Sequence, residues 1–492
     1  MQFTGKTIGV FGLGKAGRGA VEALLAAGAN VVAWDDKAEG RELSPRRMTG
    51  SGAPDAVMRR HDNILPPDQW PWDSIKTLLL APGIPFTHPK PHPVVEMAKK
   101  AGAEIICDVE LLYRLAPEAT YIGITGTNGK STTTALIGHI LKEAGKNVQV
   151  GGNIGVAAAS LLKLGAGGIY VLELSSYQLD LLNTMRFRVA ALLNITPDHL
   201  DRHGGMEGYI TAKLHIFDRQ SAGDAAIIVV DDDYTKRIAA TLCHPEQSEG
   251  THAAGDPSPS AQDDTPKVIR ISADAPPAGI SAAAFKRLPG RHNVQNMTVA
   301  YAVAREMGVA HEVIIRAIGS FPGLDHRLQW IAEKDGTTFI NDSKATNAVA
   351  TEQALRAFCG CHPERSEGSH AAGDPSPSAQ DDKRIYWLLG GLPKEGGIES
   401  LREYFPCVRH AFLFGQAAPE FAKTLEGGAP YTQCGTLETA FAKAASLAEK
   451  DGGGVVLLSP ACASFDQFLS FEHRGEVFRD LARAWEAQRK AL

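Results

Sequence analysis

The sequence is poor in cysteine, and its cysteines follow no pattern. There are seven among 492 residues, an odd number, and none forms a Cys-x-x-Cys pair. A disulfide framework or a zinc site would need paired or regularly spaced cysteines. We therefore expect reduced thiols in a cytoplasmic protein.

Long apolar runs and an excess of positive charge are also missing. No apolar run approaches the roughly 18 residues that cross a bilayer, and residues 1–6 lack a signal-peptide pattern. The net charge is −6, whereas a nucleic-acid-binding protein would present a basic face. These absences predict a protein that binds neither membranes nor nucleic acid.

What the sequence does contain is typical of a multidomain α/β protein. Its hydrophobic content of 44% and charged content of 22% are ordinary for that class. A chain of 492 residues should form about three domains. Strand-like and helical stretches alternate, which predicts parallel sheets with ligand groups at the carboxyl ends of the strands.

A glycine-rich stretch is the strongest chemical signal. An apolar run, 121–124, leads into Thr-Gly-Thr-Asn-Gly-Lys-Ser at 125–131, and a helical stretch follows at 134–144. Glycines let backbone N–H groups surround phosphate oxygens, and a helix N-terminus favours an anion. Lys130 can reach a β- or γ-phosphate, and Ser131 can face Mg²⁺. The stretch therefore predicts use of ATP or GTP, although its glycine spacing departs from the strict phosphate-loop pattern. A glycine turn without a ligand is the alternative.

A second glycine turn lies near the N-terminus. A strand-like run, 6–11, leads into Gly-Leu-Gly-Lys-Ala-Gly at 12–17, and a later strand, 30–34, ends at Asp35. Gly-x-Gly-x-x-Gly with an acidic residue about twenty positions later is a nucleotide-binding arrangement. The turn can hold NAD or another nucleotide diphosphate, and a packing turn without a ligand is the alternative.

Polar groups follow two further strand-like runs. The run 169–172 ends at Glu173, which can hold Mg²⁺ or form a structural salt bridge. The run 190–195 precedes two histidines and two aspartates at 198–203, an unusual cluster at a strand end for which a solvated polar loop is the alternative. Lys213 lies in a helical stretch, where a surface lysine is the plainer interpretation. Asn293 and Asn296 share a helical face, where they could bond a base or cap the helix.

Two segments, 243–264 and 361–382, are nearly identical and differ at two positions. They lack large apolar residues and are rich in Pro, Ser, Gly and Asp, so they cannot build a core. We interpret them as copies of one repetitive DNA element inserted into surface loops that tolerate extra length. A pair of metal-binding arms is the alternative, because each copy contains Cys and His.

Together these loops resemble the ATP-dependent Mur ligases of peptidoglycan synthesis, over nearly the whole chain outside the two inserts. Residues 125–131 match the family's phosphate loop, and Asp-His-Leu-Asp at 198–201 with His203 and Gly204 is shared widely among its members. Asn-Asp-Ser-Lys-Ala-Thr-Asn at 341–347 and Ser-Pro-Ala-Cys-Ala-Ser at 459–464 resemble the members that add D-glutamate.

The resemblance implies a three-domain α/β ligase in which ATP phosphorylates the carboxylate of UDP-N-acetylmuramoyl-L-alanine. The amine of D-glutamate then attacks the acyl phosphate, and ADP and phosphate are released. The implied domains are a Rossmann-like UDP-substrate domain (1–107), a central P-loop ATPase domain with a mostly parallel sheet (108–322) and a Rossmann-like amino-acid domain (323–492). A cytoplasmic monomer with small-molecule substrates is expected.

The resemblance also implies roles for individual residues. The catalytic set would be Lys130, Glu173, His199 and Lys213. Ser131 and Glu173 would bind one Mg²⁺, and His199 and a carbamylated Lys213 would serve a second. Contacts to ATP would come from Gly126, Thr127, Asn128, Gly129, Lys130, Ser131, Thr132, Asn293, Arg327 and Asp342. Asp35 would contact the UDP part, Asn153 and Ser175 the muramoyl part, and Lys344, Thr346, Lys394, Ser464 and Phe471 would receive D-glutamate.

Three other functions are open at this point. A relative that adds another amino acid would be expected to carry a different motif at 341–347. An NAD-dependent oxidoreductase using the turn at 12–17 would leave the phosphate loop, Glu173 and His199 without a role. A non-catalytic protein of the same fold would have no need for the four catalytic residues.

Overall fold

The structure is a computed structural model that describes residues 3–36, 64–243, 265–359 except 282, 283, 286, 287 and 289, and 384–488 except 395. Apart from Cys243, the two repeated segments lie outside these residues, so their predicted roles are not addressed. None of the helices in the described ranges is long and apolar enough to cross a membrane.

The chain divides into two compact units. Unit 1 contains residues 1–284 and 291–320, and unit 2 contains residues 285–290 and 321–492. The predicted domains 1–107 and 108–322 correspond to separate sheets, but most of both falls within unit 1. The three-domain boundaries therefore stay a prediction.

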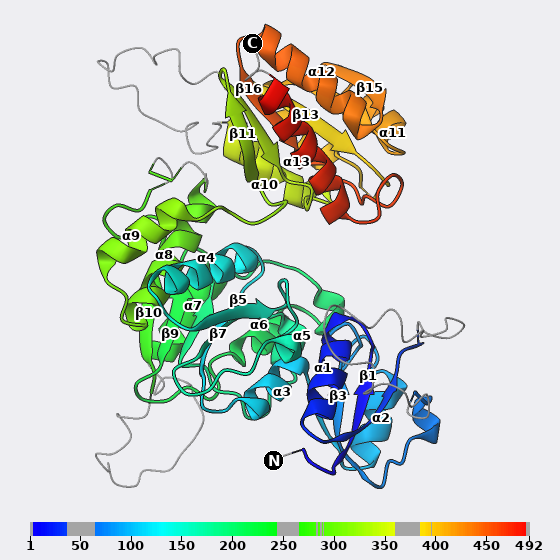
Figure 1. The fold of residues 1–492 in the computed structure, drawn as a ribbon, viewed down its shortest axis with the longest axis vertical. Helices are drawn as coiled ribbons and strands as arrows, with labels where there is room; N and C mark the ends of the chain where they lie inside the picture. The colour runs from blue at the N-terminus through cyan, green and yellow to red at the C-terminus, as the bar shows by residue number, and fades with distance from the viewer. Residues whose placement is uncertain are drawn as a thin grey trace. The chain divides into compact units, whose positions relative to one another are not determined.

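The first sheet of unit 1 is parallel, with strand order β2-β1-β3-β4 (Figure 1). Its strands are β1 (Thr7–Phe11), β2 (Asn30–Trp34), β3 (Ile75–Leu80) and β4 (Glu104–Ile106), and the accompanying helices are α1 (Lys15–Ala26), α2 (Pro93–Lys100) and α3 (Asp108–Leu115). The glycine turn follows β1 and leads into α1, as its sequence predicts.

The second sheet of unit 1 has six parallel strands in the order β10-β9-β8-β5-β7-β6. The strands are β5 (Thr120–Thr125), β6 (Val148–Gly152), β7 (Ile169–Glu173), β8 (Val189–Leu192), β9 (Ala225–Val229) and β10 (Lys267–Ile271). The helices are α4 (Lys130–Glu143), α5 (Ser176–Leu179), α6 (Met206–Leu214), α7 (Asp233–Cys243), α8 (Arg291–Glu306) and α9 (His311–Ser320). Strands β7, β8 and β9 are buried along their whole length. Such strands are near-continuous apolar runs because helices cover both faces of a parallel sheet.

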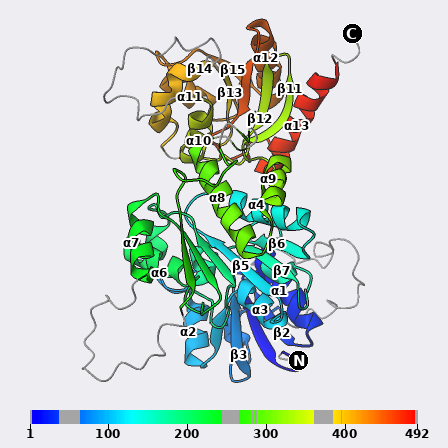
Figure 2. The same cartoon turned by 90° about the vertical axis from the view of Figure 1, so that its left-hand side faces the viewer.

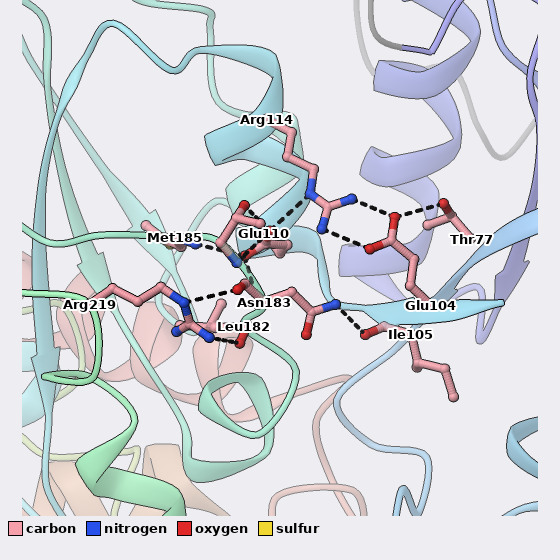
Figure 3. Close-up of polar contacts among 10 residues, drawn as sticks. Thr77, Glu104, Ile105, Glu110, Arg114, Leu182, Asn183, Met185 and Arg219 are labelled. Atoms are coloured by element: carbon pink, nitrogen blue, oxygen red, sulfur yellow. Dashed lines mark hydrogen bonds and ion pairs between the residues drawn. The ribbon is translucent and has the colours of Figure 1, made fainter. Parts of the chain in front are cut away.

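The two sheets of unit 1 are joined through a buried carboxylate on α3 (Figure 3). Glu110 is fully buried and accepts hydrogen bonds from the backbone N–H groups of 183–185 at 3.0–3.1 Å. Arg114 donates to Glu110 at 2.9 Å and to Glu104 of β4 at 2.6 Å, and Thr77 of β3 also bonds Glu104. The hydrogen bond from Arg114 holds the pKa of Glu104 below its ordinary value. This network fixes α3 to both sheets.

Unit 2 is built on a six-stranded sheet in the order β11-β12-β16-β13-β14-β15. The strands are β11 (Gln329–Lys334), β12 (Thr337–Asn341), β13 (Ile385–Gly390), β14 (Val408–Phe414), β15 (Tyr431–Gly435) and β16 (Gly454–Leu458). The helices are α10 (Ala348–Cys359), the 3₁₀ segment η9 (Glu399–Cys407), α11 (Ala418–Leu425), α12 (Leu437–Lys450) and α13 (Phe471–Gln488). Helices α12 and α13 cover one face of the sheet, while α10, η9 and α11 cover the other (Figures 1 and 2). Only β11 runs antiparallel to its neighbour among the described strands.

One pair of cysteines contradicts the expectation of reduced thiols. Cys359, the last residue of α10, forms a disulfide with Cys407, the last residue of η9, and their Cα atoms are 5.5 Å apart. This pairing could not be predicted, because the two positions are 48 residues apart and become neighbours only when α10 and η9 pack together.

Candidate active site

The phosphate loop connects β5 to α4. Gly126 and Gly129 have φ values of 145° and 82°, a region that favours glycine. A Cβ atom on Gly129 would lie 2.5 Å from the side-chain oxygen of Asn296, so a side chain does not fit there. The Nζ atom of Lys130 donates to the carbonyl oxygens of Gly126 at 2.9 Å and Thr127 at 2.8 Å. The lysine thus lies over the loop, and Ser131 and Thr132 follow it in the first turn of α4.

Asn293 and Asn296, both buried on α8, lie behind this loop. Asn296 donates to the side chain of Asn293 at 3.1 Å and accepts from the hydroxyl of Thr133 at 3.1 Å. The pair therefore holds the start of α4, and the predicted contact of Asn293 with ATP stays a prediction.

Glu173 ends β7, next to β5, and only 3% of its surface is exposed. Its Oε1 atom accepts from the side-chain amide of Asn153 at 2.9 Å, whereas the buried Oε2 atom has no hydrogen-bond partner. A buried carboxylate oxygen without a partner is unfavourable, and a cation would satisfy it. The surroundings of Glu173 therefore fit a cation at this position.

His199 and Lys213 occupy different environments. His199 lies in the loop after β8, and 57% of its side chain is exposed. Lys213 of α6 is 1% exposed, so the surface-lysine interpretation is wrong. Its Nζ atom donates to the carbonyl oxygen of Gly126 at 2.9 Å and lies 4.5 Å from the ring centroid of Tyr209. Burial, and secondarily the charge of Lys130, lower the pKa of Lys213 to about 7.

The predicted metal ligands do not form a site by themselves. Within the described ranges, no three His, Cys, Asp or Glu side chains gather in an arrangement that could hold a metal ion. Magnesium in nucleotide enzymes commonly takes one or two protein carboxylates and completes its shell with substrate phosphates and water. Glu173 and Ser131 are ligands of the kind that such an ion requires.

The predicted substrate residues of unit 1 already have structural hydrogen bonds. Asp35 accepts from the backbone N–H of Leu13 at 2.6 Å and thereby fixes the N-terminal glycine turn. Ser175 caps α5 in a reciprocal arrangement with Gln178. Contacts of Asp35 with UDP and of Ser175 and Asn153 with the muramoyl group stay predictions.

In unit 2, Asp342 is 7% exposed and accepts from the backbone N–H of Leu328 at 3.2 Å and the hydroxyl of Ser459 at 2.9 Å. Burial raises the pKa of Asp342 to about 7, although these bonds and the charge of Arg327 act in the opposite direction. The Nζ atom of Lys344 lies 4.5 Å from the ring centroid of Phe471, so these two predicted D-glutamate residues are neighbours.

Arg474 of α13 joins the loop that follows β12 to the loop that follows β16. The sequence analysis did not single out this residue. The guanidinium is completely buried and donates to the hydroxyl and carbonyl of Ser343 at 3.0 and 2.8 Å, and to the carbonyl of Cys462 at 3.1 Å. Burial lowers its pKa to about 10. The loops with Lys344 and Thr346 and with Ser464 therefore share an anchor. Lys394 is exposed and follows β13. Arg474 has Glu, His and Gly as its neighbours in the sequence. Such a polar stretch does not indicate that a charged side chain on this helix is buried.

A cavity of about 440 Å³ lies between α6 and α7, and none of its lining residues belongs to the predicted site. It is walled by apolar side chains that include Ile210, Leu214 and Phe217. Ile210 and Leu214 belong to the same helix as Lys213 but face this cavity.

Comparisons with known proteins agree with this arrangement. A family model described as the Mur ligase middle domain matches residues 124–304, and one described as the Mur ligase, glutamate ligase domain matches residues 326–462. The chain is 44% identical to a UDP-N-acetylmuramoylalanine--D-glutamate ligase from Paramagnetospirillum magneticum, covering 98% of this chain and 97% of the relative. A ligase of the same name from Rhodospirillum rubrum is also 44% identical, with 98% and 95% covered. The chain belongs to the Mur ligase family.

Solved structures of Mur ligases have the same fold. A MurF ligase from Thermotoga maritima in complex with ADP superimposes with a TM-score of 0.53 at 14% identity, covering 98% of this chain and 96% of that one. The UDP-N-acetylmuramate-alanine ligase MurC from the same organism gives 0.54 at 14% identity, with 98% and 100% covered. The predicted α/β fold class is confirmed.

Proposed function

We propose that this Mur ligase adds D-glutamate to UDP-N-acetylmuramoyl-L-alanine at the expense of ATP, in the synthesis of peptidoglycan precursors. The observation that carries the proposal is the phosphate loop beside Glu173, with its buried unpartnered oxygen, in a chain that resembles D-glutamate ligases from end to end. The proposal includes a monomer in the cytoplasm, where ATP is available.

The proposed reaction has two steps. A carboxylate oxygen of the substrate attacks the γ-phosphorus of ATP, ADP leaves, and an acyl phosphate forms. The amine of D-glutamate then attacks the acyl carbon, an amide bond forms, and inorganic phosphate leaves as the attacking nitrogen loses a proton. Because both reacting partners are anionic, positioning and cationic groups supply most of the catalysis. Lys130, at the start of α4, would offset the charge of the transferring phosphoryl group.

Magnesium would further offset the charge of the phosphates. Ser131 and Glu173 would hold one ion, and His199 with a carbamylated Lys213 would serve a second. The environment of Lys213 supports carbamylation, because a pKa of about 7 leaves much of its amine neutral and able to add carbon dioxide. The product is anionic and offers oxygen ligands.

D-glutamate would be bound in unit 2 by Lys344, Thr346, Lys394, Ser464 and Phe471. The contact between Lys344 and Phe471 supports this assignment, as does the anchoring of the adjacent loops by Arg474. ATP would be held by the phosphate loop and Asn293. The contacts of Arg327 and Asp342 with ATP stay predictions.

Phosphate release from ATP, measured with UDP-N-acetylmuramoyl-L-alanine present, tests the proposal. Separate reactions contain D-glutamate, L-glutamate, glycine or a diamino acid. We expect release that depends on D-glutamate. Release with another of these amino acids would keep the ligase and overturn the specificity. No release from folded protein with any of them would overturn the ligase assignment.

A further inference from the structure

Asn194, two residues beyond β8, binds the phosphate loop from the neighbouring strand. Its side-chain oxygen accepts from the backbone N–H of Asn128 at 2.8 Å, and its side-chain nitrogen donates to the carbonyl of Asn128 at 3.1 Å. Its own carbonyl accepts from the backbone N–H of Thr127 at 2.9 Å. The carboxamide therefore engages both polar groups of one peptide residue in the loop.

The adjoining residues extend this contact. The hydroxyl of Thr127 bonds the backbone N–H and carbonyl of Thr196 at 3.0 and 3.1 Å and lies 3.1 Å from the hydroxyl of Tyr209. A Cβ atom on Gly126 would lie 3.2 Å from the backbone nitrogen of Asn194, so the loop rests directly on the segment after β8. That segment continues into the loop with His199.

The hydrogen bonds of Asn194 also decide which donors can face a phosphate. The N–H groups of Thr127 and Asn128 are directed at Asn194 and cannot bind the nucleotide in this conformation. Phosphate binding then falls to the start of α4, where backbone N–H groups point out of the helix along its axis.

We infer that Asn194 is a positioning residue for ATP: it holds the phosphate loop in its binding conformation and couples it to the His199 loop. The inference rests on the proposed use of ATP. The carboxamide accepts from the backbone N–H of Asn128 with its oxygen and donates to the carbonyl of Asn128 with its nitrogen, so both bonds depend on this one side chain. Leucine has a similar shape but makes neither bond. Aspartate keeps the acceptor, places a second oxygen against the carbonyl of Asn128, and adds a negative charge beside the phosphates.

Calorimetric titration with ATP and magnesium tests the inference on full-length Asn194→Leu and Asn194→Asp. The matched control is Asn147→Asp, which adds the same charge at an exposed position of unit 1. Loss of two hydrogen bonds should raise the Kd for ATP about 10- to 100-fold in Asn194→Leu. A larger rise is expected for Asn194→Asp, and no change for the control.

Two further readouts separate positioning from general damage. The KM for ATP should rise while the KM for D-glutamate and the unfolding temperature stay close to those of the wild type. Binding of ATP to Asn194→Leu within about twofold of the wild type would overturn the inference. Unfolding of both variants would also overturn it, because a positioning residue must be dispensable for the fold. If the wild type itself binds no ATP, the proposed function fails instead.

Discussion

Replacing Asp342 with asparagine should make the protein more stable at neutral and alkaline pH. The carboxylate is buried, and burial raises its pKa to about 7. An asparagine has the same shape, can accept from the backbone N–H of Leu328, and can donate to the hydroxyl of Ser459. The substitution therefore removes an ionisation without removing the two hydrogen bonds.

The size and sign of the effect follow from the two protonation states. The unfolded chain ionises Asp342 near its ordinary pKa of about 4, whereas the folded protein does so near 7. Below about pH 4 Asp342 is protonated in both the folded and the unfolded state, and its full contribution to the unfolding free energy is present. As the pH rises from 4 to 7, Asp342 loses its proton in the unfolded state but keeps it in the folded state. The unfolding free energy of the wild type therefore falls by roughly 1.36 kcal/mol per pH unit, up to about 4 kcal/mol.

Urea unfolding, followed by tryptophan fluorescence between pH 4 and pH 9, measures this difference. The Asp342→Asn variant should exceed the wild type by about 2–4 kcal/mol at pH 8, and the difference should shrink toward pH 4. Asp480→Asn, at an exposed position of α13, is the control for loss of a carboxylate. A difference between Asp342→Asn and the wild type that stays constant across this pH range would refute the reasoning.

Three further predictions concern other parts of the chain. With a pKa of about 7, about half of the Lys213 amine is neutral at pH 7, against roughly one part in three thousand for an ordinary lysine. A ¹³C carbamate signal under labelled carbon dioxide should therefore grow from pH 6 to 8 and be absent in Lys213→Arg; the same signal in both proteins would contradict the assignment. Glu110→Gln should lower the unfolding free energy by about 1–3 kcal/mol and speed hydrogen exchange of the amides at 183–185; unchanged protection there would argue against the anchoring role in Figure 3. Reduction of the Cys359–Cys407 disulfide, which spans 48 residues, should cost unit 2 about 4 kcal/mol of stability; an unfolding midpoint insensitive to dithiothreitol, with the double serine variant as control, would exclude that contribution.

The parts of the fold that could be predicted are those with an uninterrupted local signal. The runs 121–124 and 169–172 fall within β5 and β7, since apolar residues buried on both faces of a sheet produce a continuous pattern. Strands β11 and β15 lie at the edges of their sheet and alternate or expose their residues, so no run marks them. β6 ends in two glycines, so no apolar run marks this strand in the sequence either.

The site residues that could be predicted also have a local signal in the sequence. Glu173 ends a strand and Lys130 begins the helix after one, and at such positions side-chain type and topology suffice to suggest a role. The burial of Lys213 could not be foreseen, because α6 directs this lysine toward a loop 87 residues earlier. Asn194 and Arg474 act on partners 66 and 131 residues away. Such contacts depend on tertiary packing, which a single sequence does not display.

The two repeated segments, which we interpret as insertions, lie in connections between helices and strands, away from the predicted site residues. The first lies between α7 and β10, and the second between α10 and β13. A connection from a helix to the next parallel strand returns to the amino-terminal edge of the sheet, whereas the phosphate loop, Glu173, Lys344 and Lys394 follow the carboxyl ends of strands. Lengthening such a loop eightfold costs roughly 2 kcal/mol of closure entropy. The disulfide of Cys359, next to the second segment, joins α10 to the residue before β14. The disulfide would contribute about 4 kcal/mol of stability, which exceeds the entropy cost of lengthening the loop that contains the second segment.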